Sequence, residues 1–265
     1  MAVLEIERRG TAAWVWLNRP EVRNALNEEL STALGKAFES LEKDASARVV
    51  VLAGRGPAFC AGGDLGRMEV AAKFSQAKAR RDAGRFAKLL YRIHAFPKPV
   101  IARVHGAAFA GGMGLVAASD LVVAAEEAEF CLPETRIGLV PAMISPYLVR
   151  AMGEQQARRY MLTGERFSAR EALRLGFAHE CVSSAELDDS VGKLAERLAQ
   201  AGPQALATTK KLLMQVGKAP ISPKLGLETA AVLAKARAGA EAREGIRSFL
   251  EKRKPLWVKE GESKG

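Results

Sequence analysis

The stretch FAGGMGLVAASDLVVAAEEAEFCLPETRIGLVP, Phe109 to Pro141, joins a glycine cluster to an apolar run and then places Glu134 among apolar neighbours. A strand-like segment, VIARVHG (Val100 to Gly106), precedes the cluster. An earlier strand-like segment, RVVVLAG (Arg48 to Gly54), likewise leads into a second glycine cluster, CAGGDL (Cys60 to Leu65). Repetition of strand, glycine turn and helix predicts an α/β fold.

The rest of the chain fits one main core with an appendage, as expected for 265 residues. Two strands around a turn at Gly10 precede a helix that Asn27 can cap, and a second helix is predicted from Ser75 to Phe96. From Leu187 onward the pattern is helical and is interrupted by prolines. We expect residues 1–200 to form the core that carries the site and residues 201–265 to form a helical C-terminal region.

The composition leaves several kinds of partner open. A net charge of +10 suits nucleic acid, anionic lipid or a phosphate-rich ligand, but the basic residues are scattered and aromatic residues make up only 6%. We therefore do not expect nucleic acid to be the partner. The three cysteines show no metal-ligand spacing, and neither a signal peptide nor a membrane span is predicted. These features indicate a cytoplasmic protein with no metal site and no membrane partner.

Neither glycine cluster has the pattern of a nucleotide-binding loop, because no Walker A sequence and no G-x-G-x-x-G follows a strand. Each cluster instead falls at a strand-to-helix junction, where free backbone N–H groups point outward. Two adjacent junctions can direct two N–H donors at one oxygen and form an oxyanion hole. The alternative is that the glycines only permit tight turns and close packing.

Five motifs together resemble the crotonase superfamily, the enoyl-CoA hydratases and isomerases, over about residues 11–258: LNRPEVRNAL, CAGGDL, AGGMGLVAASDLVVAA, FCLPETRIGLVP and EGIRSFLEKRKP. The resemblance implies a spiral of ββα repeats with a helical C-terminal region that takes part in trimer packing. It also implies a homotrimer or homohexamer that acts on an acyl-CoA thioester. No cofactor is implied apart from the coenzyme A of the substrate.

The resemblance also assigns roles to residues of this chain. Gly63 and Gly111 match the two backbone donors to the thioester oxygen, and Glu134 matches an acid/base glutamate. The positions that match substrate-binding segments are Arg23, Ala61, Asp64, Leu65, Gly114, Phe249 and Lys252. Phe249 and Lys252 correspond to positions that reach the nucleotide from an adjacent subunit. Where the family often has a basic residue two positions after Asp64, this chain has Gly66, and Arg67 offers a shifted phosphate contact.

Gly114 occupies the position of a second glutamate of typical enoyl-CoA hydratases. One interpretation is a hydratase in which Glu134 alone activates water and the space beside Gly114 receives a branched or carboxylated acyl group. The ISPY sequence after VPA resembles hydratases for methylglutaconyl-CoA-type substrates and favours this interpretation. The main alternative is an isomerase that moves one proton with a single glutamate, and the further alternatives are an RNA-binding or a catalytically degenerate relative.

Overall fold

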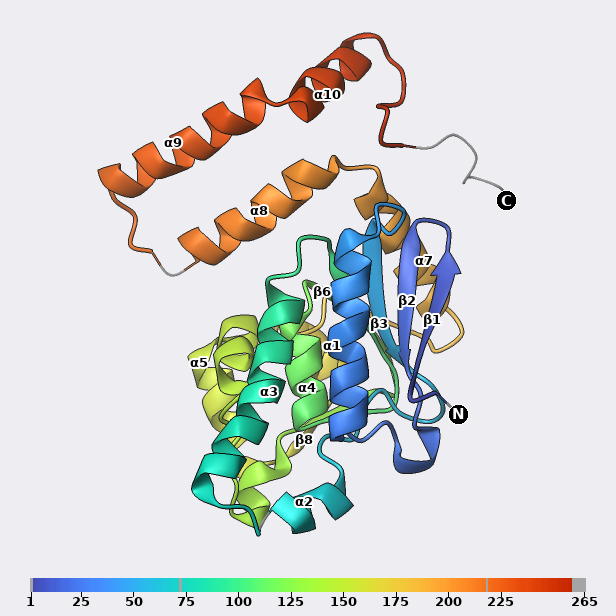
Figure 1. Ribbon diagram of the computed structural model, residues 1–265, viewed down its shortest axis with the longest axis vertical. Helices are drawn as coiled ribbons and strands as arrows, with labels where there is room; N and C mark the ends of the chain where they lie inside the picture. The colour runs from blue at the N-terminus through green and yellow to red at the C-terminus, as the bar shows by residue number, and fades with distance from the viewer. Residues whose placement is uncertain (1, 72, 218, 259–265) are drawn as a thin grey trace.

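A six-stranded sheet forms the centre of the computed structural model, which describes residues 2–71, 73–217 and 219–258. The strands in spatial order are β1 (Leu4–Arg9), β2 (Ala12–Leu17), β3 (Val49–Gly54), β4 (Val100–Val104), β6 (Leu121–Ala125) and β9 (Glu180–Val182). β1 and β2 form an antiparallel hairpin around Gly10, and the remaining neighbours are parallel (Figure 1). The predicted α/β class is therefore confirmed.

Both faces of this sheet are covered, which explains why β2 and β3 are apolar at every position. Alternate β2 residues such as Val15 belong to a core shared with α1 (Glu28–Lys43), α3 (Gln76–His94) and α4 (Gly111–Ala118). The residues between them, such as Trp14, pack with α7 (Leu187–Ala199) on the other face. The chain thus forms three layers, with the predicted Asn27 cap present at the start of α1.

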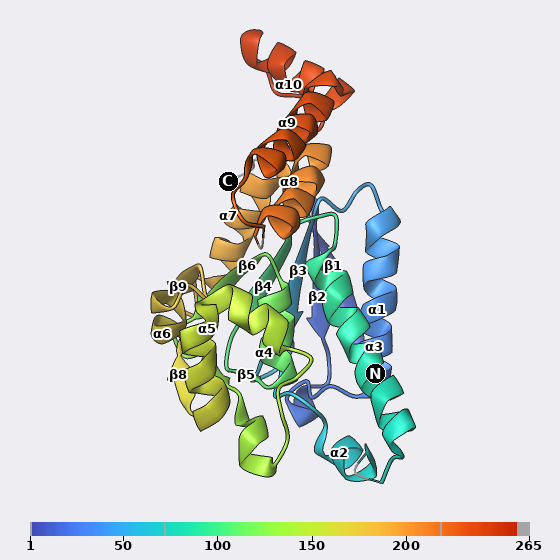
Figure 2. The ribbon, with the colours of Figure 1, turned by 90° about the vertical axis from the view of Figure 1, so that its left-hand side faces the viewer.

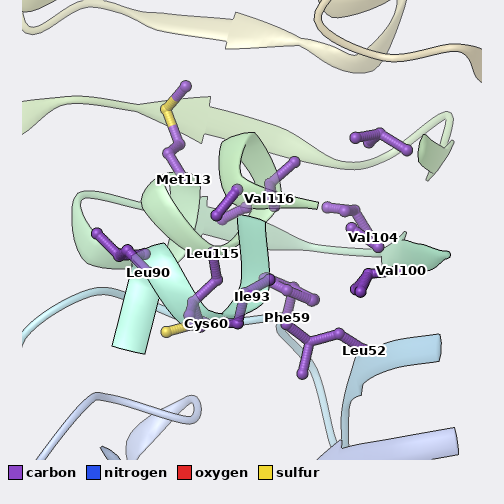
Figure 3. Close-up of a cluster of buried hydrophobic side chains, with 14 of the residues drawn as sticks. Leu52, Phe59, Cys60, Leu90, Ile93, Val100, Val104, Met113, Leu115 and Val116 are labelled. Atoms are coloured by element: carbon purple, nitrogen blue, oxygen red, sulfur yellow. The ribbon is translucent and has the colours of Figure 1, made fainter. Parts of the chain in front are cut away.

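A second, three-stranded sheet lies beside the first and contains β5 (Ala107–Phe109), β7 (Glu129–Cys131) and β8 (Arg166–Ser168). α6 (Ala169–Arg174) contacts β7 and β8, and α5 (Ser145–Thr163) packs Tyr160 against Phe167 of β8. α2 (Leu65–Ala71) begins at the end of the CAGGDL cluster, and 3-10 turns lie at Pro20–Val22 and Pro133–Ile137. Between the two sheets, α4 is buried nearly all round. Figure 3 shows its Leu115 and Val116 among side chains from α3 and β4.

The C-terminal helices α8 (Pro203–Val216), α9 (Pro223–Ala238) and α10 (Ala240–Leu250) extend away from the sheets, at the end of the molecule opposite α2 (Figures 1 and 2). Lys210 of α8 forms an ion pair with Asp120 at 2.6 Å and thereby connects this region to the core. Large apolar side chains on these helices are exposed, namely Leu213, Leu227, Leu233, Ile246, Phe249 and Leu250, as is Ile221 between α8 and α9. Across the described ranges, none of the helices has the length and apolarity needed to span a membrane.

Candidate active site

The two glycine clusters lie directly against each other. Cys60 pairs with the β5 segment in a parallel bridge, in which the Cys60 N–H donates to the Ala107 carbonyl at 3.0 Å and the Phe109 N–H donates to the Cys60 carbonyl at 2.9 Å. Segments about 50 positions apart in sequence thus run side by side as they leave the core. This contact places the two junctions side by side, as the expected oxyanion hole requires.

Glycine is required where the two junctions touch. A Cβ atom at Gly62 would lie 2.8 Å from the Ala110 Cβ, and one at Gly112 would lie 2.4 Å from the Cys60 carbonyl oxygen. Contacts this short do not occur between real side chains and backbone, so any larger residue would separate the junctions. Close approach between the junctions, and not only a tight turn, therefore accounts for these glycines.

The backbone geometry directs the Gly63 and Gly111 N–H groups away from other protein acceptors. Leu26 bonds to both neighbours of Gly63, donating to Gly62 at 2.7 Å and accepting from Asp64 at 3.1 Å, so that the Gly63 N–H points away from Leu26. Gly111 is the first residue of α4, where an N–H has no acceptor within the helix. Within the described part of the chain, neither N–H has a protein acceptor.

Ala110, the residue before α4, adopts φ 47° and ψ −118°, which a side chain rarely permits. Such a conformation costs about 1–3 kcal/mol and persists only where the surroundings hold it in place. Here the Ala110 N–H donates to the Cys131 carbonyl at 2.9 Å. The strained residue therefore sets the direction in which the chain enters α4 at Gly111.

Gly63 and Gly111 line one cavity of about 580 Å³ together with Glu134. Apolar side chains form much of its wall, including Leu26, Met68, Phe86, Leu89, Leu139, Val140, Met143 and Ile144. Charged groups of α1, α2 and α3 also line it, and Arg67, Arg85 and Arg92 form ion pairs there with Asp82, Glu28 and Glu39. The cavity thus brings the two unpaired N–H donors together with the Glu134 carboxyl group.

Glu134 lies in the Pro133–Ile137 turn that follows β7. Its Oε2 atom is buried and has no hydrogen-bond partner among the residues that the structure describes. Burial raises the pKa of Glu134, and a hydrogen bond from its own backbone N–H offsets part of that increase. A carboxyl group that is partly desolvated and has a free oxygen is suited to exchanging protons with a ligand in the cavity.

Ile144 fills the space beside Gly114. A Cβ atom on Gly114 would lie 2.2 Å from the Ile144 Cγ2 and 3.1 Å from its Cβ. Ile144 is only 2% exposed, and Gly114 is not part of the cavity lining. The expectation that an acyl group enters the space beside Gly114 is therefore wrong for this structure, because an isoleucine side chain already occupies that space.

Comparisons with known proteins agree with this architecture. The family model described as Enoyl-CoA hydratase/isomerase matches residues 7–260. The chain belongs to the enoyl-CoA hydratase/isomerase family. It is 40% identical over 258 residues to a "Putative enoyl-CoA hydratase" of Thermus thermophilus, covering 96% of this chain and 99% of the relative. It is 35% identical over 267 residues to a "Carnitinyl-CoA dehydratase" of Salmonella enteritidis, covering 96% and 97%.

Solved structures confirm the fold. An enoyl-CoA hydratase from Shewanella pealeana superposes with a TM-score of 0.93 at 37% identity, covering 96% of each chain. A hydratase/isomerase described as a crotonase, from Legionella pneumophila, superposes with a TM-score of 0.91 at 36% identity, covering 97% of this chain and 100% of the other. The predicted crotonase-like α/β fold is thus confirmed, and the chain is an enzyme of the enoyl-CoA hydratase/isomerase family.

Of the residues assigned to coenzyme A, Arg23 and Ala61 lie together just outside the cavity lining. The Ala61 N–H donates to the Arg23 carbonyl at 2.9 Å, and the Arg23 side chain is exposed. Arg67, the suggested phosphate contact, lines the cavity and is already paired with Asp82 and Glu28. Leu65 begins α2, and its side chain lies outside the described part of the chain.

Asp64 lines the cavity but is held by protein partners. Partial burial opposes its ionisation, but hydrogen bonds from Arg19, at 3.0 Å, and from the Arg67 and Gly66 N–H groups lower its pKa overall. Sequence reasoning missed Arg19, whose guanidinium also donates to the Ala25 carbonyl at 2.6 Å. Asp64 and Arg19 therefore connect the Gly63 junction to the loop that precedes α1.

Phe249 and Lys252 lie far from the cavity of their own chain. Phe249 is 82% exposed near the end of α10, at the opposite end of the molecule from α2 (Figure 1). Neither residue lines the cavity. Their assignment to the substrate therefore depends on a neighbouring subunit and remains a prediction.

Proposed function

We propose that this enzyme adds water across the 2,3 double bond of an enoyl-CoA thioester, with Glu134 as its acid/base. The observation that carries the proposal is the buried, unpartnered Oε2 atom of Glu134 in the same cavity as the unpaired N–H groups of Gly63 and Gly111. The relatives named hydratase and dehydratase support it, since adding and removing water are two directions of one reaction.

In the proposed mechanism, the Glu134 carboxylate takes a proton from water while the water oxygen bonds to C3. The electron pair of the double bond moves toward the thioester carbonyl, whose oxygen gains negative charge. The Gly63 and Gly111 N–H groups donate to that oxygen and stabilise the enolate. Protonated Glu134 then returns the proton to C2, which yields a 3-hydroxyacyl thioester and restores the carboxylate.

One observation favours a second candidate, the shift of a double bond between the 2,3 and the 3,4 positions of the acyl chain. An isomerase needs to move a proton between C2 and C4 but needs no activated water, so a single carboxylate is sufficient. In this structure, Ile144 stands where a typical hydratase would have its second carboxylate. We rank hydration first because the ISPY sequence resembles that of hydratases and because the named relatives include a dehydratase.

The acyl group is the least defined part of the proposed substrate. A carboxylated acyl group, as in methylglutaconyl-CoA, requires an available cation. Arg67, Arg85 and Arg92 in the cavity wall are each paired with a carboxylate, whereas Lys88 also lines the cavity and forms no ion pair among the described residues. We therefore propose an enoyl-CoA substrate whose acyl group is either uncharged or carboxylated. Coenzyme A is part of that substrate, and we propose no further cofactor and a cytoplasmic location.

We further propose that the enzyme works as a homotrimer or homohexamer. The exposed apolar side chains of α8, α9 and α10 support this proposal, because a monomer rarely leaves so many in contact with water. Phe249 and Lys252 would then reach the coenzyme A of an adjacent subunit.

The test is product identification by mass spectrometry in D2O. We would incubate 2-enoyl-CoA and 3-enoyl-CoA esters, including methylglutaconyl-CoA, with the wild-type enzyme. Gain of one water by a 2-enoyl-CoA supports hydration. Migration of the double bond with deuterium uptake but no added water would instead establish isomerisation, and no change in any ester would overturn both candidates.

A further inference from the structure

We propose that Ile144 determines which acyl groups the enzyme accepts, by closing the cavity toward α4. The inference rests on the proposed function for its substrate class, because it takes the cavity to hold the acyl end of a coenzyme A thioester. Ile144 lines the cavity and is the N-terminal cap residue of α5.

Ile144 is fixed in place. Its Cγ2 methyl group fills the space that a Cβ on Gly114 of α4 would occupy, and the Leu90 Cδ2 of α3 lies 3.6 Å from that Cβ position. The Ile144 carbonyl accepts hydrogen bonds from the Tyr147 and Leu148 N–H groups at 3.1 Å each. Side chain and backbone are thus both held, so the residue cannot move aside readily to admit a larger ligand.

Ile144 also anchors the wall that precedes it. Residues Leu139, Val140, Pro141, Ala142 and Met143 all line the cavity, yet Leu139 and Val140 are 49% and 72% exposed. The Ser145 N–H bonds back to the Pro141 carbonyl at 3.0 Å, and Ile144 is the buried end of this segment. The position of the apolar wall therefore depends on how Ile144 packs against Gly114.

Two substitutions change the contact between Ile144 and Gly114 in opposite directions. Ile144→Ala removes the methyl group beside Gly114 and opens the cavity toward Leu90 and α4. Gly114→Ala adds a carbon that collides with Ile144 and forces its side chain toward the cavity. One variant should therefore enlarge the accepted acyl group, and the other should reduce it.

The test measures the affinity of saturated acyl-CoA thioesters by calorimetry, so that its outcome does not depend on which reaction occurs. The probes are butanoyl-, 3-methylbutanoyl-, hexanoyl- and octanoyl-CoA, and the readout is the affinity for each larger ester divided by the affinity for butanoyl-CoA. This ratio cancels losses common to all ligands. One methylene group in an apolar pocket changes selectivity by roughly 10- to 200-fold.

We expect at least one of these affinity ratios to rise at least about tenfold in Ile144→Ala and the ratios to fall in Gly114→Ala. Leu148→Ala is the matched control, because Leu148 is fully buried in α5 but does not line the cavity, and its ratios should equal those of the wild type. Unchanged ratios in Ile144→Ala, or an equal change in Leu148→Ala, would overturn the inference. Failure of the proposed reaction would instead appear as no product from any enoyl-CoA ester while these binding ratios still shifted.

Discussion

Glu134 and Gly114 stand at the two positions where the family places its carboxylates, and the structure treats them in opposite ways. Glu134 keeps a carboxyl oxygen that is buried without a partner, whereas Gly114 has no side chain and is packed against Ile144. Buried polar groups are normally hydrogen-bonded, so the free oxygen indicates a ligand-facing role. The contrast indicates that apolar packing fills the space beside Gly114, so that in the proposed mechanism Glu134 carries all proton transfer.

The largest effect on activity should come from separating the two glycine clusters. In Gly112→Ala, the new Cβ would lie 2.4 Å from the Cys60 carbonyl oxygen and would displace α4. Misplacing one oxyanion donor should lower kcat by about 10²- to 10³-fold, as measured by steady-state kinetics. Gly192→Ala in α7, where no atom lies within 4 Å of the new Cβ, is the control and should retain wild-type kcat. Full activity in Gly112→Ala would contradict the proposed donor geometry.

A smaller effect should follow from changing the packing at Gly114. Gly114→Ala should lower the free energy of unfolding by about 1–3 kcal/mol, because its Cβ overlaps Ile144. Adding Ile144→Ala should recover part of that loss, with a coupling energy of about 0.5–3 kcal/mol in urea denaturation. Val191→Ala, on α7 in the separate core on the other face of the sheet, should instead lower stability independently of Gly114→Ala. Additive losses in both pairs would show that Ile144 and Gly114 do not depend on each other.

The pH dependence of activity should reveal the environment of Glu134. Burial raises its pKa above the ordinary value of 4.5, and the proposed hydration requires the carboxylate. The kcat/KM should therefore fall as the pH drops through the raised pKa and reach a plateau above it. An acidic limb centred at or below pH 4.5 would be inconsistent with a desolvated Glu134.

The contribution of Glu134 to stability should change with pH in the direction opposite to activity. Because the folded-state pKa of Glu134 is raised, the folded protein holds this proton more tightly than the unfolded chain does. The resulting stabilisation is complete below pH 4.5 and is lost as the pH rises through the folded-state pKa. The free energy of unfolding of the wild type, relative to Glu134→Gln, should therefore decrease over that interval. A difference that stays constant with pH would argue against the raised pKa.

The smallest effect concerns residues remote from both positions. Phe249→Ala should raise KM for acyl-CoA by up to about tenfold, equivalent to about 1.4 kcal/mol of binding, and leave kcat unchanged. This result is expected only if the residue contacts the substrate of a neighbouring subunit, since it lies outside the cavity of its own chain. Leu250→Ala, also exposed on α10, is the adjacent control. Equal KM values for the wild type and Phe249→Ala would remove Phe249 from the substrate site.

Much of the fold follows from local sequence signals. The Asn27 side chain accepts a hydrogen bond from the first turn of α1, as its predicted capping position requires. The apolar run from Val49 to Gly54 is buried on both faces, as a central parallel strand requires. By contrast, β5 and β7 have three residues each and show too little periodicity to be recognised. Their pairing arises from contacts between distant segments.

The candidate site was predictable only in part, for the same reason. The motifs indicated Gly63, Gly111 and Glu134, and the structure places all three on one cavity. The contact between Gly114 and Ile144 joins residues 30 positions apart on different elements. No local pattern in the sequence indicates that Ile144 fills the space beside Gly114. The sequence therefore wrongly indicated an acyl pocket beside Gly114.

The most direct test of the central claim, that Glu134 alone transfers protons, is kcat for hydration of the preferred 2-enoyl-CoA by Glu134→Gln. This change keeps the size of the side chain but removes its proton exchange. The account predicts a loss of at least about 10²-fold in kcat with substrate affinity retained. Glu129→Gln, at an exposed residue of β7 that pairs with Arg166, is the control and should keep wild-type kcat. A Glu134→Gln enzyme within a few-fold of the wild-type rate would contradict the claim.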